Sequence, residues 1–187
     1  MGYIPKHAKS VFKGVLFEVF QWDQVVYDGT TRIFEAVQRQ YSTYAIATKG
    51  DKIILLKQRQ PHLRTTFYEF PGGRMDVVGE SARQSALREL LEETGMKPKK
   101  IRLWKVIRHN FPVVDAIYVF IANDCTKVVD QKLDGGEKIE ILELSYPEFL
   151  EILDHTRMHK GTLWKDMKFI LAEKNGKQKL KNIIFNA

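Results

Sequence analysis

The chain has 187 residues, of which 44% are hydrophobic and 28% charged, and its formal net charge is +7. This length favours one domain with its own core, and the composition is that of an ordinary soluble protein. A single cysteine, Cys125, excludes an internal disulfide framework and fits a reducing compartment, so we expect a cytoplasmic protein. No run reaches the roughly 18 apolar residues of a membrane span, and residues 1–10 lack the features of a signal peptide.

The first third of the chain has the pattern of successive strands. Residues 11–28 alternate loosely and are rich in Val, Phe, Trp and Tyr, which favours a strand, and Asp28-Gly29 predicts a turn after it. Further strands are predicted at residues 31–38, 41–48, 52–60 and 67–70. The last of these leads into a Gly-Gly loop.

A helix is predicted over residues 82–94. Ser81 and Gln84 have the spacing of a capping box at its start, and Gly95 supplies the left-handed residue that commonly ends a helix. We expect the leucines at positions 87, 90 and 91 to be buried against the rest of the protein.

The opposite face of this helix carries three carboxylates. Glu89, Glu92 and Glu93 are spaced i, i+3, i+4, which places them within about 100° of one another around the helix axis. Their mutual repulsion destabilises the helix, and a hard divalent cation with oxygen ligands would offset it. A solvated acidic face is the alternative interpretation.

The remaining elements are predicted from the same signals. Strands are expected at 101–108, 113–123 and 138–144, a polar loop at 124–138, and helices at 147–155 and 163–174. The order of strands and helices indicates an α+β protein in which the acidic helix packs on a sheet. Basic clusters at 97–105 and 174–182 are interpreted as solvated surface, because no RNA-binding signature accompanies them, and we expect no nucleic-acid partner.

Residues 88–96, with the sequence RELLEETGM, resemble the helical half of the Nudix box. Glu80 precedes Arg88 by seven intervening residues, as that pattern requires, but six residues rather than five separate Gly73 from Glu80. The loop 74–79 therefore carries one extra residue. The resemblance implies a Nudix-like α/β/α sandwich with a mixed sheet in residues 41–187, preceded by an N-terminal antiparallel strand extension in residues 1–40.

The resemblance also assigns the metal-binding residues. It implies that Glu89, Glu92 and Glu93 bind Mg²⁺ or Mn²⁺, and that the carbonyl of Gly73, or of Gly72, adds a ligand. Two further positions of the box follow. Arg88 is expected to serve catalysis by orienting a glutamate through an ion pair, and Glu80 and Gly95 are expected to have structural roles, Glu80 as the partner of Arg88.

Glu137 is our candidate for the general base. It lies in a glycine-flanked loop before a late strand, which resembles the loop that carries the base in the ADP-ribose pyrophosphatase branch of the Nudix family. The alternatives are a loop glutamate in water and, as a second candidate base, Glu140, although the alternation of residues 139–141 favours a solvent-facing position for Glu140.

Three features resemble this ADP-sugar branch: the strand block before the box, Glu69 two residues before Pro71, and Pro112 sixteen residues past Met96. The resemblance implies a homodimer that hydrolyses the pyrophosphate bond of a nucleotide sugar, ADP-ribose being converted to AMP and ribose 5-phosphate. The predicted substrate-binding residues are Trp22, Gln58, Arg59, Glu69, Gly72 and Pro112. A core role for Trp22 and an exposed basic rim around Arg59 are the alternatives.

Two other functions stay open at this point. The substrate could be a nucleoside triphosphate, a dinucleoside polyphosphate or an RNA cap, or the chain could be a non-catalytic Nudix-fold module that binds a nucleotide or RNA. The presence of all three box glutamates favours an enzyme over the binding module.

Overall fold

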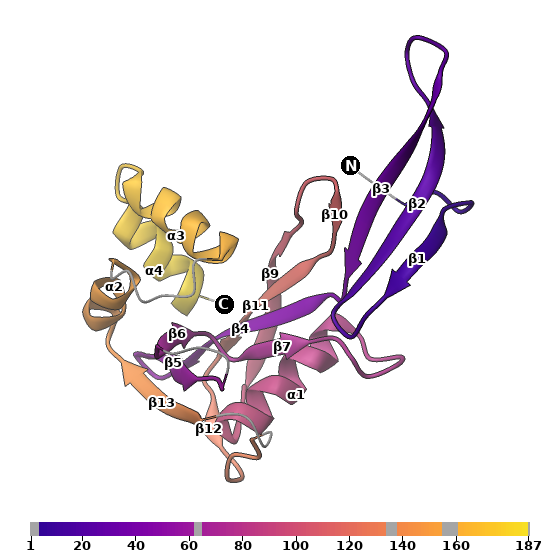
Figure 1. The fold of residues 1–187 in the computed structure, drawn as a ribbon. Helices are drawn as coiled ribbons and strands as arrows, with labels where there is room; N and C mark the ends of the chain where they lie inside the picture. Colours follow the sequence, from indigo (N-terminus) through magenta and orange to yellow (C-terminus); the bar gives the residue numbers. More distant parts are fainter. Residues whose placement is uncertain (1–3, 62–64, 134–137, 155–160, 187) are drawn as a thin grey trace.

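A computed structural model of the protein describes residues 4–61, 65–133, 138–154 and 161–186 (Figure 1). Its centre is a mixed seven-stranded sheet in the order β13-β5-β4-β11-β9, with β6 paired to β5 and β7 paired to β4. Strands β4 and β11 run parallel. The strands of this sheet are β4 (Ser42–Lys49), β5 (Lys52–Arg59), β6 (Phe67–Glu69), β7 (Gly72–Arg74), β9 (Lys100–Ile107), β11 (Ile117–Asn123) and β13 (Lys138–Leu144).

Helices cover both faces of this sheet. One face packs against α2 (Tyr146–Asp154), α3 (Thr162–Ala172) and α4 (Gly176–Phe185), and the other packs against α1 (Ala82–Thr94) (Figure 1). Alternation along the strands divides the core, because Ile46 points to the three-helix side and Ala45 and Ala47 point to α1. The predicted α/β/α sandwich of the α+β class is thereby confirmed.

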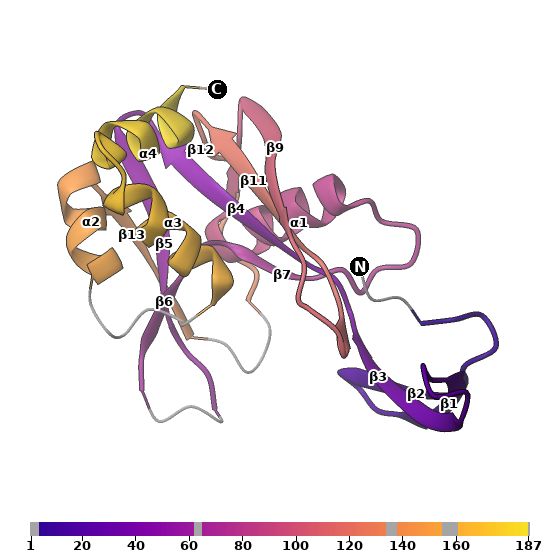
Figure 2. The same cartoon turned by 90° about the horizontal axis from the view of Figure 1, so that it is seen from above.

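The N-terminal strands form a separate sheet that projects from the sandwich, and we call β1 to β3 the arm (Figures 1 and 2). It consists of β1 (Lys9–Lys13), β2 (Phe17–Val25) and β3 (Thr31–Arg39), and the short β10 (Val113–Val114) adds to β3. Strands β1, β2 and β3 pair antiparallel, as expected for the extension. The boundary between residues 40 and 41 stays a prediction.

The acidic helix begins and ends where its sequence predicts. The Ser81 hydroxyl accepts the Gln84 N–H, and the Gln84 side chain accepts the Ser81 N–H, so both halves of the capping box form. Gly95 has a φ of 70°. The segment 126–132 then satisfies the carbonyls at the end of α1, because the N–H groups of Val128 and Lys132 bond the carbonyls of Gly95 and Glu92. Its β12 (Thr126–Lys127) also pairs with β8 (Met96–Lys97).

Two single strands predicted from the sequence are each two strands, and the prediction was wrong there. The first, 11–28, is the β1–β2 hairpin, which turns at Gly14, whose N–H bonds the carbonyl of Phe17. The second, 113–123, breaks at Asp115 because that carboxylate turns inward to bond His109. The predicted Gly-Gly loop is strand β7, since backbone pairing with β4 outweighs the low strand propensity of glycine.

The lysines of the basic cluster at 174–182 are exposed, as expected, but the helix α4 that carries most of them was not predicted. Helix α4 buries Leu180 and Ile184 completely in the core. These two residues are four apart and so share one helix face, whereas Lys177, Lys179 and Lys181 are exposed. The segment 124–138, predicted to be a polar loop, contains the short strand β12.

The buried face of α1 differs from the expected leucine face. Leu90 is fully buried, but Leu87 and Leu91 are only partly buried. The buried positions are Ser85, Ala86, Leu90, Glu93 and Thr94. Because the residues that β4 presents to the helix are small, α1 lies close to the sheet and one of its carboxylates is buried there.

Cys125 is buried, as expected, and burial raises the pKa of its thiol to about 11. None of the helices in the described part of the chain is long and apolar enough to cross a membrane. The cytoplasmic location stays a prediction.

Replacing Gly95 by alanine is expected to destabilise the fold. The left-handed φ costs an alanine about 1–2 kcal/mol, and its Cβ would lie 2.0 Å from the carbonyl oxygen of Val129. Gly50 is the control, because its φ is 58° but no atom lies within 4 Å of a Cβ there. Chemical unfolding should show Gly95→Ala to be less stable than Gly50→Ala by at least about 1 kcal/mol. Equal losses would contradict the contact between α1 and the segment 126–132.

Candidate active site

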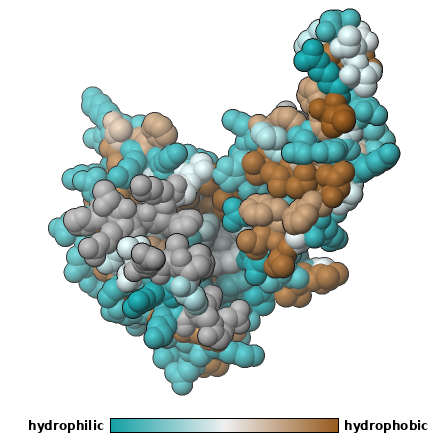
Figure 3. All heavy atoms as spheres, in the orientation of Figure 1, coloured by the Kyte–Doolittle hydropathy of each residue, from teal (hydrophilic) through white to brown (hydrophobic). Residues whose placement is uncertain are grey.

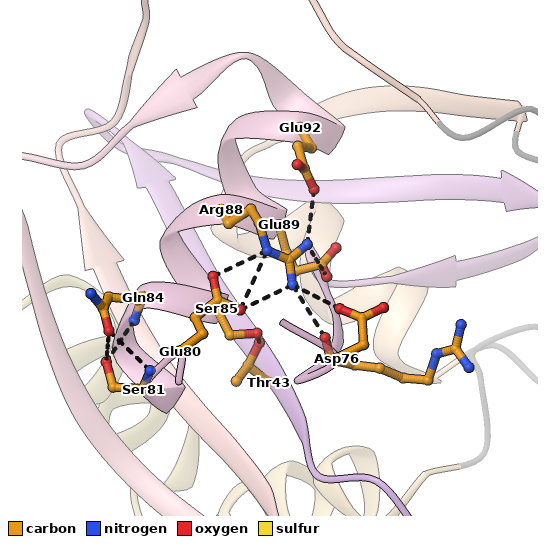
Figure 4. A network of polar contacts seen from close by, with 10 residues as sticks. Thr43, Asp76, Glu80, Ser81, Gln84, Ser85, Arg88, Glu89 and Glu92 are labelled. Atoms are coloured by element: carbon orange, nitrogen blue, oxygen red, sulfur yellow. Dashed lines mark hydrogen bonds and ion pairs between the residues drawn. The ribbon is translucent and has the colours of Figure 1, made fainter. Parts of the chain in front are cut away.

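The guanidinium of Arg88 is the centre of a cluster of carboxylates on and beside α1 (Figure 4). Its Nε donates to both carboxylate oxygens of Glu80, at 3.1 and 3.4 Å. Its Nη1 bridges Glu89 and Glu92 at 2.8 and 3.0 Å. Its Nη2 reaches Asp76 Oδ1 at 3.4 Å. One cation therefore fixes four carboxylates, and Arg88 positions them.

The third box glutamate is held from the sheet. Glu93 is 5% exposed, and its Oε2 accepts the backbone N–H of Gly72 at 2.7 Å. Beside it, a Cβ on Gly73 would lie 2.6 Å from the carboxyl carbon of Glu89. A side chain at position 73 would therefore displace the Glu89 carboxylate from its place beside β7.

The negative charges outnumber the positive one in this cluster. Burial of Glu89 raises its pKa to about 7, the bonds and charge of Arg88 lower it, and the charges of Glu92 and Asp76 raise it further. Burial works against the charge on Arg88, but its bonds to Glu80, Glu89 and Glu92 outweigh burial and raise its pKa. The site therefore favours a further cation close to Glu89.

These carboxylates open into a cavity of about 520 Å³, which we call the carboxylate cavity. Its walls come from β3, β4, β5, β6, β7, α1 and the segment after β12. The side chains and backbone that line it include Arg39, Tyr44, Gln58, Glu69, Gly72, Gly73, Arg74, Asp76, Glu89, Glu92, Glu93 and Lys132. Acidic and basic groups thus face each other across one space, which suits a phosphorylated ligand bound with a cation.

The comparisons with known proteins agree with this geometry. The sequence pattern of the NUDIX domain matches residues 38–165, which is more than half of the chain. The chain belongs to the Nudix family. This confirms the enzyme class predicted from residues 88–96, that of a Nudix hydrolase, and the matched range includes the Arg88 cluster.

Similar proteins cover most of the chain at modest identity. An ADP-ribose pyrophosphatase of Bacillus subtilis (strain 168) is 27% identical over 154 residues, which is 81% of this chain and 83% of that protein. A methanol dehydrogenase activator of Bacillus methanolicus is 27% identical over 169 residues, covering 88% and 87% of the two chains. The crystal structure of an ADP compounds hydrolase superposes with a TM-score of 0.66 at 19% identity, over 88% of this chain and 92% of that one, and it shares the fold.

The extra residue of the Nudix box lies away from the carboxylate cavity. The loop turns at Val77–Gly79, where the Glu80 N–H bonds the carbonyl of Val77, and the side chain of Val78 is fully exposed. The residues before the turn keep their contacts, since Asp76 and the carbonyl of Arg74 both accept from Arg88. The insertion is therefore taken up by an exposed turn and leaves the box cluster assembled.

The fold brings together most of the predicted site residues. Glu89, Glu92, Glu93, Gly72, Gly73, Gln58 and Glu69 all line the carboxylate cavity, Arg88 does as well, and Glu80 is bonded to Arg88 as expected. Three predicted substrate-binding residues lie outside its wall: Trp22, Arg59 and Pro112. Glu137 lies outside the described residues. Glu140 is exposed and pairs with Lys57 at 2.7 Å.

The three outlying residues have other surroundings. Trp22 is 8% exposed in the arm and packs against Phe34 and Phe111. The carbonyl of Pro112 accepts the N–H of Val37, which joins the arm to the β9–β11 connection. Arg59 ends β5 at an exposed position. Within one chain, Trp22 and Pro112 therefore hold the arm against neighbouring segments and do not reach the carboxylate cavity.

Eight residues of the cavity wall were missed from the sequence: Leu16, Arg39, Ser42, Tyr44, Gln60, Arg74, Asp76 and Lys132. Tyr44 lies inside a strand and donates its hydroxyl to Glu69. Burial, and then the charge and hydrogen bond of Glu69, hold the pKa of Tyr44 well above its ordinary value, so the hydroxyl stays a donor. Pairing of β4 with β7 brings Tyr44 to the box, and no local pattern predicts that pairing.

The residues present fit a divalent cation. Arg88 and the Gly72 N–H occupy some of the acceptor positions of the three box glutamates, and an ionised carboxylate offers about four. Burial is the largest cause of the raised pKa of Glu89, and a cation bound beside it would favour its ionised form. Glu89, Glu92 and Glu93 are the residues that would hold the ion.

When a chelator removes metal ions, the free energy of unfolding is expected to depend on the ionisation of Glu89. The pKa of Glu89 is about 7 in the folded protein, above its ordinary value of 4.5. The protonated carboxyl therefore contributes fully to the free energy of unfolding below pH 4.5, and this contribution is lost as the pH rises through 7. In Glu89→Gln, the decrease in the free energy of unfolding between pH 5 and pH 8 should be smaller than in the wild-type protein by about 2 kcal/mol. Urea unfolding at the two pH values measures it, with Glu143→Gln as the control on an exposed pair with Lys49. An unchanged pH dependence would contradict it.

Proposed function

We propose that this chain is a Mg²⁺- or Mn²⁺-dependent pyrophosphatase that hydrolyses ADP-ribose to AMP and ribose 5-phosphate. The observation that carries the proposal is the meeting of the box carboxylates with Gly72 and Gly73 in one cavity that also presents Arg39, Arg74 and Lys132. The names of the Bacillus subtilis relative and of the solved structure, an ADP-ribose pyrophosphatase and an ADP compounds hydrolase, support the choice of substrate.

The protein supplies the positions of the reacting groups. Arg88 holds Glu89 and Glu92 side by side, and the Gly72 N–H fixes Glu93, so that the three carboxylates face the cavity together. A bound divalent ion would neutralise phosphate oxygens and lower the pKa of a water molecule. Arg39, Arg74 and Lys132 bind the anionic diphosphate from the other walls.

Contacts to the substrate come from the strands of the central sheet. Gln58, Glu69 and the backbone of Gly72 line the cavity, and the bond from Tyr44 fixes the Glu69 carboxylate. Gln58 is only 3% exposed, so its amide is already oriented before a ligand binds. These groups position the diphosphate relative to the box.

Glu137 remains our proposed general base. The residue after it, Lys138, pairs with Arg59, and the neighbours of Arg59 in sequence, Gln58 and Gln60, both line the carboxylate cavity. The strand β13, which follows Glu137 in sequence, therefore pairs with a residue of the cavity wall, since Ile139 is opposite Gln58. Its role is to accept a proton from the attacking water.

Glu93→Gln is expected to lower kcat on ADP-ribose by at least about a hundredfold while leaving the fold intact, because it removes a charge that faces the reacting phosphate. Product analysis by chromatography measures AMP and ribose 5-phosphate, and Glu143→Gln serves as the control, since Glu143 pairs with Lys49 away from the cavity. Near wild-type turnover in Glu93→Gln would refute the proposed mechanism.

The same assay separates the proposed substrate from its alternatives. Release of inorganic pyrophosphate from a nucleoside triphosphate, or cleavage of a dinucleoside polyphosphate in preference to ADP-ribose, would overturn the choice of ADP-ribose. Absence of turnover on all these compounds with Mg²⁺ and Mn²⁺ would favour a binding module.

We further propose that the arm joins two copies of the chain. Large apolar side chains are exposed along it and gather on one side of the molecule in Figure 3. They are Val11, Phe12, Val15, Leu16, Phe17, Val25, Tyr27 and Ile33. A second copy would cover this surface, since contiguous exposed apolar patches commonly mark interfaces.

A double variant tests this dimer. Phe12→Asp with Val15→Asp should shift the mass in solution from twice the chain mass of 21.8 kDa to the chain mass, because charge is placed in the apolar contact. Light scattering after gel filtration measures the mass. Val78→Asp, at a fully exposed valine of the loop 74–79, is the matched control. A monomeric wild-type protein would contradict the proposal.

A further inference from the structure

A second cavity adjoins the carboxylate cavity, and we call it the distal cavity. It has a volume of about 340 Å³, which is within the range of small-molecule sites. Both cavities are lined by Arg39, Tyr44 and Glu69, so they share this part of their walls. An elongated ligand with its diphosphate at the box could therefore extend across the wall into the distal cavity.

A paired histidine forms part of this cavity. His109 lines it, and its Nδ1 lies 2.7 and 2.8 Å from the two carboxylate oxygens of Asp115. The backbone N–H of His109 also bonds Asp115, at 3.3 Å. The Asp115 side chain is 3% exposed and the His109 side chain 39% exposed.

The buried carboxylate fixes the imidazole. A carboxylate in the protein interior needs a hydrogen-bond donor, and His109 provides it through Nδ1. Nε2 is then the ring nitrogen left to contact a ligand. Because Asp115 comes from the break between β10 and β11, this arrangement is built into the fold and prepared before a ligand arrives.

The walls of the distal cavity suit a sugar better than a base. Three aromatic side chains line it. Phe70 and Trp164 stack on each other at 4.9 Å between ring centroids and 12° between planes, and they are 1% and 7% exposed, so their faces are occupied by each other and by the core. The third, Tyr44, donates its hydroxyl to Glu69. What the cavity offers instead are donors from Arg39, His109 and Lys165, beside the aliphatic side chains of Ile117 and Leu163. Hydroxyl groups and the C–H face of a sugar match that surface.

We propose that the distal cavity binds the sugar beyond the diphosphate, and that His109, oriented by Asp115, hydrogen-bonds a hydroxyl of that sugar and so selects nucleoside diphosphate sugars over nucleoside diphosphates. The proposal rests on the proposed function for the identity of the ligand. A purely structural pair, which only closes the connection between β9 and β11, is the competing explanation and predicts no dependence on the ligand.

Binding of two non-hydrolysable ligands tests the proposal without turnover. The probes are α,β-methylene-ADP-ribose and α,β-methylene-ADP, measured by calorimetry with Mg²⁺ on the full chain. Wild-type protein should bind the sugar compound more tightly. His109→Ala should weaken binding of the sugar compound roughly five- to tenfold, the effect of one lost hydrogen bond, and should leave binding of methylene-ADP unchanged. Asp115→Asn, which still offers Nδ1 an acceptor oxygen, should cause a smaller loss of the same selectivity.

His7→Ala is the matched control, because His7 lines a different cavity on the arm with Trp22 and Ile33. Equal weakening of both ligands by His109→Ala, or no weakening of either, would overturn the proposal. Equal binding of the two ligands by wild-type protein would also overturn it. If the protein binds the sugar compound selectively through His109 but does not hydrolyse ADP-ribose, the proposed function fails and the distal sugar site stands.

Discussion

The charge balance around Arg88 is the constraint on which the site depends. A single guanidinium bonds Glu80, Glu89, Glu92 and Asp76, and without it these carboxylates, two on α1 and two in the loop before it, would repel one another. Burial is the largest cause that raises the pKa of Glu89; the charge and bonds of Arg88 lower it, and the charges of Glu92 and Asp76 raise it. The cluster is therefore held in position and still attracts a cation, which is the combination that a metal-dependent hydrolase needs.

The close packing of α1 on β4 brings this cluster to the rest of the site. Ala45 and Ala47 on the strand meet Ser85, Ala86 and Leu90 on the helix, and the Thr43 and Ser85 hydroxyls lie 3.4 Å apart. Small side chains let the helix lie near the sheet, so that Glu93 reaches the backbone of strand β7. Larger residues at these positions would separate the carboxylates from Gly72 and Gly73, although the box sequence would be unchanged.

Local patterns predicted those parts of the fold whose signals are complete within a few residues. The capping box at Ser81 and the left-handed Gly95 set both ends of α1, because each satisfies backbone groups of its own helix. The prediction failed at Asp115 and at α4, where side-chain contacts outside the local pattern decide the outcome. Asp115 breaks a strand to bond His109, and α4 is helical because Leu180 and Ile184 complete a core that includes residues of β4, β5, β9 and β11.

The sequence by itself determined the Nudix box, the carboxylate face of its helix and the sandwich class, since these follow from spacing along one helix and from the order of elements. Tertiary structure alone decided which other residues join the box. Pairing of β4 with β7 brings Tyr44 to Glu69, an exposed turn absorbs the extra residue of the loop, and the break before β11 places His109 beside a second cavity. These contacts depend on strand pairing, turn geometry and side-chain packing rather than on spacing along one element, so no local periodicity encodes them.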